Sequence, residues 1–147
     1  HTLHVIKLCE AIYEIYPQMD LDLLLTGAIL HDIGKVREFS VKTSIKITEE
    51  GMLRGHLVIG EEMVLEKMKA IPEFPETLMM KVSHILLSHH GNGEFGSPKS
   101  PQFPEAAAVY YADEMDSKVD QYVTIKEETD SMDFRIYTKR LGELYLK

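Results

Sequence analysis

The chain has 147 residues, about the length of one domain, and its 44% hydrophobic and 27% charged residues are typical of a globular protein. No apolar run approaches the roughly 20 residues of a membrane span, and the start lacks the basic-then-apolar pattern of a signal peptide. The net charge of −8 argues against a surface that binds a nucleic-acid backbone unaided. The single cysteine, Cys9, cannot form an internal disulfide and fits a reducing compartment, so we expect a cytoplasmic protein.

Apolar residues at helical spacing predict an all-α fold, a single bundle of five to six helices with a short extended C-terminal tail. The expected helices are residues 1–16, a segment from the cap Asp20 to a break at Gly34, residues 55–70, 75–89 and 105–125. Apolar and polar residues alternate loosely over residues 41–48, which predicts a short extended excursion. Residues 91–104 are rich in glycine and proline and predict a long loop of the kind that is often functional. We expect a domain over residues 1–126 and a tail over 127–147 that packs on the domain or on a partner.

The second predicted helix carries the most informative stretch. Its apolar run Leu23–Leu30 belongs in a core, and it ends on His31 and Asp32. A buried carboxylate costs several kcal/mol if it has no partner, so a metal ion or a strong hydrogen-bonding cation is implied at Asp32. Lys35 follows within reach of that ligand.

Other candidate groups are histidines and one set of acids. All seven histidines lie at or before position 90, and Asp113, Glu114 and Asp116 share an otherwise apolar helix. Imidazole and carboxylate together suit Mn²⁺, Fe²⁺, Zn²⁺ or Ni²⁺, whereas a pure oxygen set would suit Mg²⁺ or Ca²⁺. Each group taken alone has a structural interpretation, such as a cap at His56 or a dipole contact at His89 and His90. Their joint occurrence favours a metal site.

The order of these residues resembles a known family. His1, His31-Asp32 and Asp113 resemble the H…HD…D signature of the HD superfamily of metal-dependent phosphohydrolases. His56 and the His89-His90 pair resemble the subset that binds two metals. Counting back from Leu8-Cys9-Glu10-Ala11-Ile12 and Tyr16-Pro17, the first ligand position of the family falls on His1 rather than His4.

Further segments resemble the HD domain of the YhaM family of 3′→5′ exoribonucleases. They are Tyr16-Pro17, Leu30-His31-Asp32-Ile33-Gly34-Lys35-Val36, Gly55-His56, Leu87-Ser88-His89-His90-Gly91, Gly96-Ser97-Pro98-Lys99 and Asp113-Glu114-Met115-Asp116-Ser117-Lys118. The resemblance covers residues 1 to about 118. Because this family joins an OB-like nucleic-acid-binding domain to the HD domain, and the chain begins on His1, the resemblance implies an N-terminal OB-like domain absent from this chain.

The resemblance also implies roles for individual residues. One divalent ion would be held by His1, His31, Asp32 and Asp113, and a second by Asp32, His56 and His89 or His90, with Asp32 bridging. Expected ions are Mn²⁺, Fe²⁺, Ni²⁺ or Zn²⁺, with Mg²⁺ as an alternative. Asp32 and Lys35 would be catalytic, Lys35 and Lys99 would hold the phosphate, and Phe95 would stack on a base.

We therefore expect a metal-dependent phosphohydrolase or phosphodiesterase, most similar to an exoribonuclease acting on single-stranded RNA. One alternative is a small-molecule nucleotide phosphohydrolase, either a nucleotidase or a dinucleotide hydrolase. Another is a non-catalytic HD signalling module, against which the intact ligand set counts. The sequence leaves homo-oligomer formation open.

Overall fold

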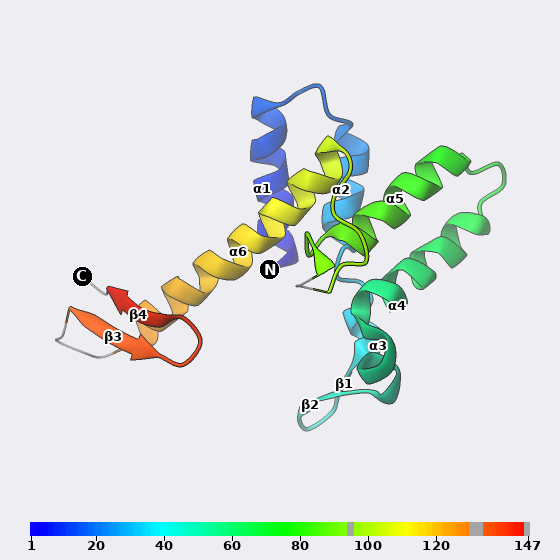
Figure 1. Cartoon of the computed structure of the whole chain (residues 1–147). Helices are drawn as coiled ribbons and strands as arrows, with labels where there is room; N and C mark the ends of the chain where they lie inside the picture. The colour runs from blue at the N-terminus through cyan, green and yellow to red at the C-terminus, as the bar shows by residue number, and fades with distance from the viewer. Residues whose placement is uncertain (94–95, 130–133, 146–147) are drawn as a thin grey trace. The chain divides into compact units, whose positions relative to one another are not determined.

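A computed structural model describes residues 1–93, 96–129 and 134–145 of the chain. It forms two compact units, residues 1–116 and 117–147. The described helices are α1 (Thr2–Ile15), α2 (Leu21–Leu30), α3 (Lys35–Glu38), α4 (Glu49–Lys69), α5 (Glu76–Ser88) and α6 (Pro104–Glu128), shown in Figure 1. The all-α fold expected from the sequence is confirmed.

Helix α2 lies at the centre of the first unit, packed against α1 and α5. Leu23, Leu24 and Ala28 are almost fully buried, in a core shared with residues of α1, α4, α5 and α6. The Asp20 side chain caps the helix by accepting a hydrogen bond from the Leu23 N–H at 3.0 Å. The backbone N–H of Asp20 in turn donates to Glu105 Oε1 at 2.7 Å, which ties the start of α6 to the start of α2.

The C-terminal end of α2 leads into a close contact with α4. The helix ends at Leu30 with His31 as its C-cap, four residues before the expected break at Gly34. A turn over residues 31–34 then leads to the short helix α3. A Cβ on Gly34 would clash with the backbone oxygen of His56 and would lie 2.7 Å from the Gly60 nitrogen. Glycine at position 34 therefore lets this turn approach the backbone of α4.

The third predicted helix begins earlier than the sequence indicated. We expected it to start near Gly55, but α4 starts at Glu49 because Thr48 Oγ1 accepts the Gly51 N–H at 2.9 Å. Gly55 has φ +69° and ψ 158°, so it interrupts the helix with a kink that favours glycine. A new helical run therefore begins at His56.

Two small hairpins complete the described chain. β1 (Phe39–Val41) pairs antiparallel with β2 (Ile45–Ile47), where a short extended excursion was expected. In the second unit, β3 (Arg135–Thr138) pairs antiparallel with β4 (Gly142–Tyr145). No helix among the described residues has the length and apolar character needed to cross a membrane. The Cys9 side chain lies in the core, where burial raises its pKa to about 12.

We predict that Gly34→Ala lowers the free energy of unfolding by about 3 kcal/mol, because the added methyl group meets backbone atoms that cannot rotate away. Urea unfolding followed by circular dichroism measures this change. Gly93→Ala is the matched control, since its Cβ would meet no described atom within 4 Å. Equal stability of the two variants would contradict a tight contact at Gly34.

Candidate metal centre

The ends of several helices in the first unit bring the predicted ligands together. His1 is the N-cap of α1, His31 the C-cap of α2, and His89 the C-cap of α5. Asp32 and His90 each follow a C-cap, His56 begins the second part of α4, and Asp113 lies on α6. Helix ends, together with Asp113 in the interior of α6, place imidazoles and carboxylates around one point although their positions in the sequence are far apart. Helix α4, which contains the expected helix over residues 55–70, contributes His56.

One set of ligands, which we call the Asp113 group, consists of His1, His31 and Asp113. His1 Nε2 lies 3.0 Å from Asp113 Oδ1 and 3.3 Å from His31 Nε2. Two ligands bonded at about 2.1 Å to one ion stand about 3.0–3.4 Å apart at octahedral or tetrahedral angles. Two of the three spacings match this range, and the third, 3.9 Å between His31 Nε2 and Asp113 Oδ1, is somewhat longer, so the three side chains could share one ion after a small movement.

A second set, the His56 group, consists of His56, His89 and His90. His56 Nε2 and His90 Nε2 lie 3.3 Å apart, again a spacing that suits two ligands of one ion. The His89 side chain is fully buried.

Asp32 lies between the two groups and turns one oxygen toward each. Its Oδ2 lies 3.6 Å from His1 Nε2 and 3.5 Å from His31 Nε2, both in the Asp113 group. Its Oδ1 lies 3.6 Å from His56 Nε2 and 3.8 Å from His89 Nε2, both in the His56 group. A carboxylate in this position can bridge two ions.

Backbone carbonyls orient the two buried histidines. His31 Nδ1 donates to the carbonyl oxygen of Ala28 at 2.8 Å, and His89 Nδ1 donates to that of Leu86 at 2.9 Å. A carbonyl oxygen can only accept, so the proton must be on Nδ1 in both rings. Both Nε2 atoms then carry a lone pair, which is the form of imidazole that binds a metal.

Carboxylates orient two other histidines, a role that was not predicted from the sequence for either acid. Asp116 Oδ2 accepts from His1 Nδ1 at 2.7 Å, and its Oδ1 lies 3.0 Å from His4 Nδ1. Glu38 Oε2 lies 3.1 Å from His56 Nδ1. The i,i+3 spacing of Asp113 and Asp116 could have indicated a shared helix face. No pattern in the sequence indicated Glu38.

Burial and neighbouring charges shift the pKa values in this site. Burial lowers the pKa of His89 to about 3, with help from His90 and His31, and burial also lowers the pKa of His56. For Asp32, burial acts to raise the pKa, but His31, Lys35 and His89 together bring it below its usual value. Burial raises the pKa of Asp113. Histidines that stay neutral are suited to binding cations.

The donor set fits a metal ion. Among the described residues, Asp32 Oδ1 and His89 Nε2 are buried and have no hydrogen-bond partner. Buried polar atoms without partners are costly, and these two lie where a bound cation would satisfy both. The Nε2 atoms of His1 and His31 lie 3.3 Å apart, so one bound cation could contact both.

The other residues singled out in the sequence belong to neither ligand group. Lys35 Nζ lies 2.6 Å from Asp32 Oδ2, at the edge of the site. Lys99 is exposed, and its charge helps burial to lower the pKa of His84. Phe95 lies outside the described residues. His4 contacts Asp116, one contact removed from the proposed ligands.

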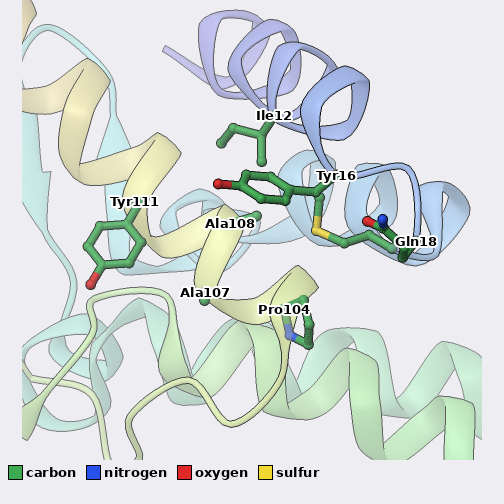
Figure 2. Close-up of a pocket in the computed structure, with 8 residues that line it drawn as sticks. Ile12, Tyr16, Gln18, Pro104, Ala107, Ala108 and Tyr111 are labelled. Atoms are coloured by element: carbon green, nitrogen blue, oxygen red, sulfur yellow. The ribbon is translucent and has the colours of Figure 1, made fainter.

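A groove with a volume of about 460 Å³ lies between α1 and the first turns of α6 (Figure 2). Ile12 and Tyr16 line one side, and the small side chains of Ala107 and Ala108 leave room on the other. None of its lining residues belongs to either ligand group, so we assign the groove no part in the metal chemistry.

The model of the HD domain family matches residues 1–118, which include every candidate ligand described above. The chain belongs to the HD domain family. The membership expected from its motifs is therefore confirmed. No solved structure matches this HD domain chain.

Three curated relatives of this HD domain come from bacteria. The chain is 45% identical over 123 residues to the "3'-5' exoribonuclease YhaM" of Bacillus velezensis and 44% identical to the protein of that name from Bacillus subtilis. Each match covers 81% of this chain and 38% of the relative. A third such protein, from Shouchella clausii, is 39% identical over 119 residues. The chain thus spans well under half the length of these relatives.

We predict that the HD domain, kept in a chelator, loses stability as the pH falls below about 6.5. The unfolded chain has His89 near its ordinary pKa of 6.5, whereas burial holds the folded value at about 3. Between these values the unfolded chain binds a proton that the folded chain does not, so acid favours unfolding. Urea unfolding of wild type and His89→Gln at pH 4.5 to 8 measures the effect. As the pH is lowered, the free energy of unfolding should fall more steeply for wild type than for His89→Gln. Equal dependence on pH in the two proteins would contradict a buried neutral His89.

Proposed function

We propose that this HD domain is the catalytic part of a metal-dependent phosphohydrolase that removes nucleotides from the 3′ end of single-stranded RNA. The observation that carries the proposal is the position of Asp32, which turns one oxygen toward each histidine group. The reaction and the RNA substrate are inferred from relatives named as 3′–5′ exoribonucleases.

In this proposal the two groups hold two divalent ions. The Asp113 group and Asp32 hold one, and the His56 group and Asp32 hold the other. When bound, such ions lower the pKa of a water molecule and neutralise the charge of phosphate oxygens. Mixed imidazole and carboxylate ligands favour Mn²⁺, Fe²⁺, Zn²⁺ or Ni²⁺ over Mg²⁺.

Lys35 is the proposed phosphate-binding residue of this chain. Its ammonium group lies 2.6 Å from Asp32 Oδ2, the oxygen that faces the Asp113 group, and its side chain is 44% exposed. An ion at the Asp113 group would compete with Lys35 for that oxygen. The flexible lysine would then be free to reach a phosphate oxygen beside the ions. We also propose Lys99 and Phe95 as substrate contacts, on the basis of the motifs alone.

The rest of the longer protein completes the proposal. Because the chain carries a net charge of −8 and its relatives are much longer, we infer that another domain, OB-like by resemblance, supplies most of the RNA affinity. The same negative charge is the observation that favours the alternative, hydrolysis of a small nucleotide that needs no extended basic surface. We propose a cytoplasmic location because the lone Cys9 fits a reducing compartment.

Metal analysis and two substrates test the proposal together. We expect about two transition-metal ions per wild-type chain, and loss of both ions and of activity in Asp32→Ala, because one carboxylate serves both groups. With Mn²⁺, RNA labelled at its 5′ end should give a ladder of shortened products. Release of phosphate or mononucleotides from soluble nucleotides, with RNA left intact, would favour the alternative. Full metal content and turnover in Asp32→Ala would contradict the assignment of Asp32.

A second substitution isolates the role of Lys35. We predict that Lys35→Met keeps the metal content and lowers kcat/KM on the order of 10²-fold, because a cation that stabilises phosphate charge is lost. Lys67→Met is the matched control, since Lys67 is an exposed lysine of α4 that pairs with its exposed neighbour Glu66. Unchanged kcat/KM in Lys35→Met would remove Lys35 from the phosphate site.

A further inference from the structure

The histidines of the metal centre are oriented in two different ways. Backbone carbonyls fix the buried His31 and His89, as described above. Carboxylates contact Nδ1 of two less buried histidines, His1 and His56. These carboxylates are Asp116 and Glu38, and neither is a proposed ligand. In His1 and His56, a carboxylate therefore stands where a carbonyl oxygen accepts the Nδ1 proton in His31 and His89.

Glu38 uses both of its oxygens on the same residue. Oε1 accepts the backbone N–H of His56 at 3.1 Å, and Oε2 lies 3.1 Å from His56 Nδ1. The glutamate is 8% exposed and close to Gly51, where a Cβ would lie 2.9 Å from Glu38 Cγ. Its side chain is therefore held in place, with its two oxygens committed to the backbone and the ring of His56.

We propose that Glu38 is a positioning residue that keeps the proton of His56 on Nδ1, so that Nε2 is free to bind an ion in the His56 group. The inference rests on the proposed metal centre and adds to it the residue that prepares His56. Asp116 has the same role toward His1, with its second oxygen on His4. A histidine whose ring nitrogen is held in this way is a better metal ligand than one free to change tautomer.

The contacts predict different results when each carboxylate is replaced by its amide, in Glu38→Gln and Asp116→Asn. In Glu38→Gln, the amide oxygen must face the His56 backbone N–H, because that group can only donate. The amide N–H₂ then points at His56 Nδ1 and moves the ring proton to Nε2, where it blocks an ion. In Asp116→Asn, the oxygen can stay on His1 while the N–H₂ turns to the exposed His4, whose ring can change tautomer.

Titration of the chain with Mn²⁺, followed by calorimetry, tests this difference. We expect Glu38→Gln to lower the affinity for one of the two Mn²⁺ ions by about 10- to 100-fold. We expect Asp116→Asn to lower the affinity by less than about tenfold. Both variants remove one negative charge, so an effect of charge alone would weaken binding equally and would overturn the proposal. Glu61→Gln is the matched control, because Glu61 is a half-buried carboxylate of α4 that accepts from Ser83 Oγ at 2.6 Å.

A second measurement needs no metal and reads the tautomer directly. Long-range ¹H–¹⁵N correlations of the histidine rings, recorded in a chelator, should show His56 protonated on Nδ1 in wild type and on Nε2 in Glu38→Gln. A proton on Nε2 of wild-type His56 would overturn the inference, even if Glu38→Gln did not fold. A wild type that binds no ion would count against the proposed function, while the ring spectra would still decide the role of Glu38.

Discussion

Asp32 stands between two groups of imidazoles and offers one oxygen to each. Its position depends on α2, whose buried apolar face sets the place where the helix ends. It also depends on the contact between Gly34 and the backbone of α4, which brings the turn after Asp32 against His56. The core therefore determines the spacing of the two groups, since a shift of α2 relative to α4 would separate one of them from the shared carboxylate.

Two kinds of hydrogen-bond partner orient the imidazoles. His31 and His89 lie at helix C-caps, where the carbonyl three residues earlier is within reach of Nδ1. His56 begins a helical run after the kink at Gly55, so no regular helical turn directly before it supplies such a carbonyl, and His1 is the N-cap of α1. Acidic side chains from other segments take that place. For His31, His89 and His56, the position on the helix thus accounts for the kind of partner that orients the ring.

Much of this arrangement could be predicted from the sequence, because its strongest signals are local. The cap at Asp20 and the apolar run before His31 were enough to locate α2, and the order of the histidines and Asp113 was enough to indicate the HD family. The kink at Gly55 was missed, since Thr48 caps an extra helical segment that the apolar pattern does not reveal. Glu38 was missed because its contact with His56 spans 18 residues of sequence and exists only after the chain folds. The assignments of Lys99 and Phe95 remain predictions from motifs.

The proposed ligands come from five helices or their ends, and His1 and Asp113 lie close to opposite ends of the matched family region. An ion bound there would act as a reversible cross-link in a chain whose only cysteine is buried and unpaired. Stability would then follow the supply of metal in the cell, with a gain of about 2.7 kcal/mol when the free ion is a hundred times its Kd. Metal starvation would loosen the fold as well as stop the chemistry, so the level of the protein itself could report the metal status of its surroundings.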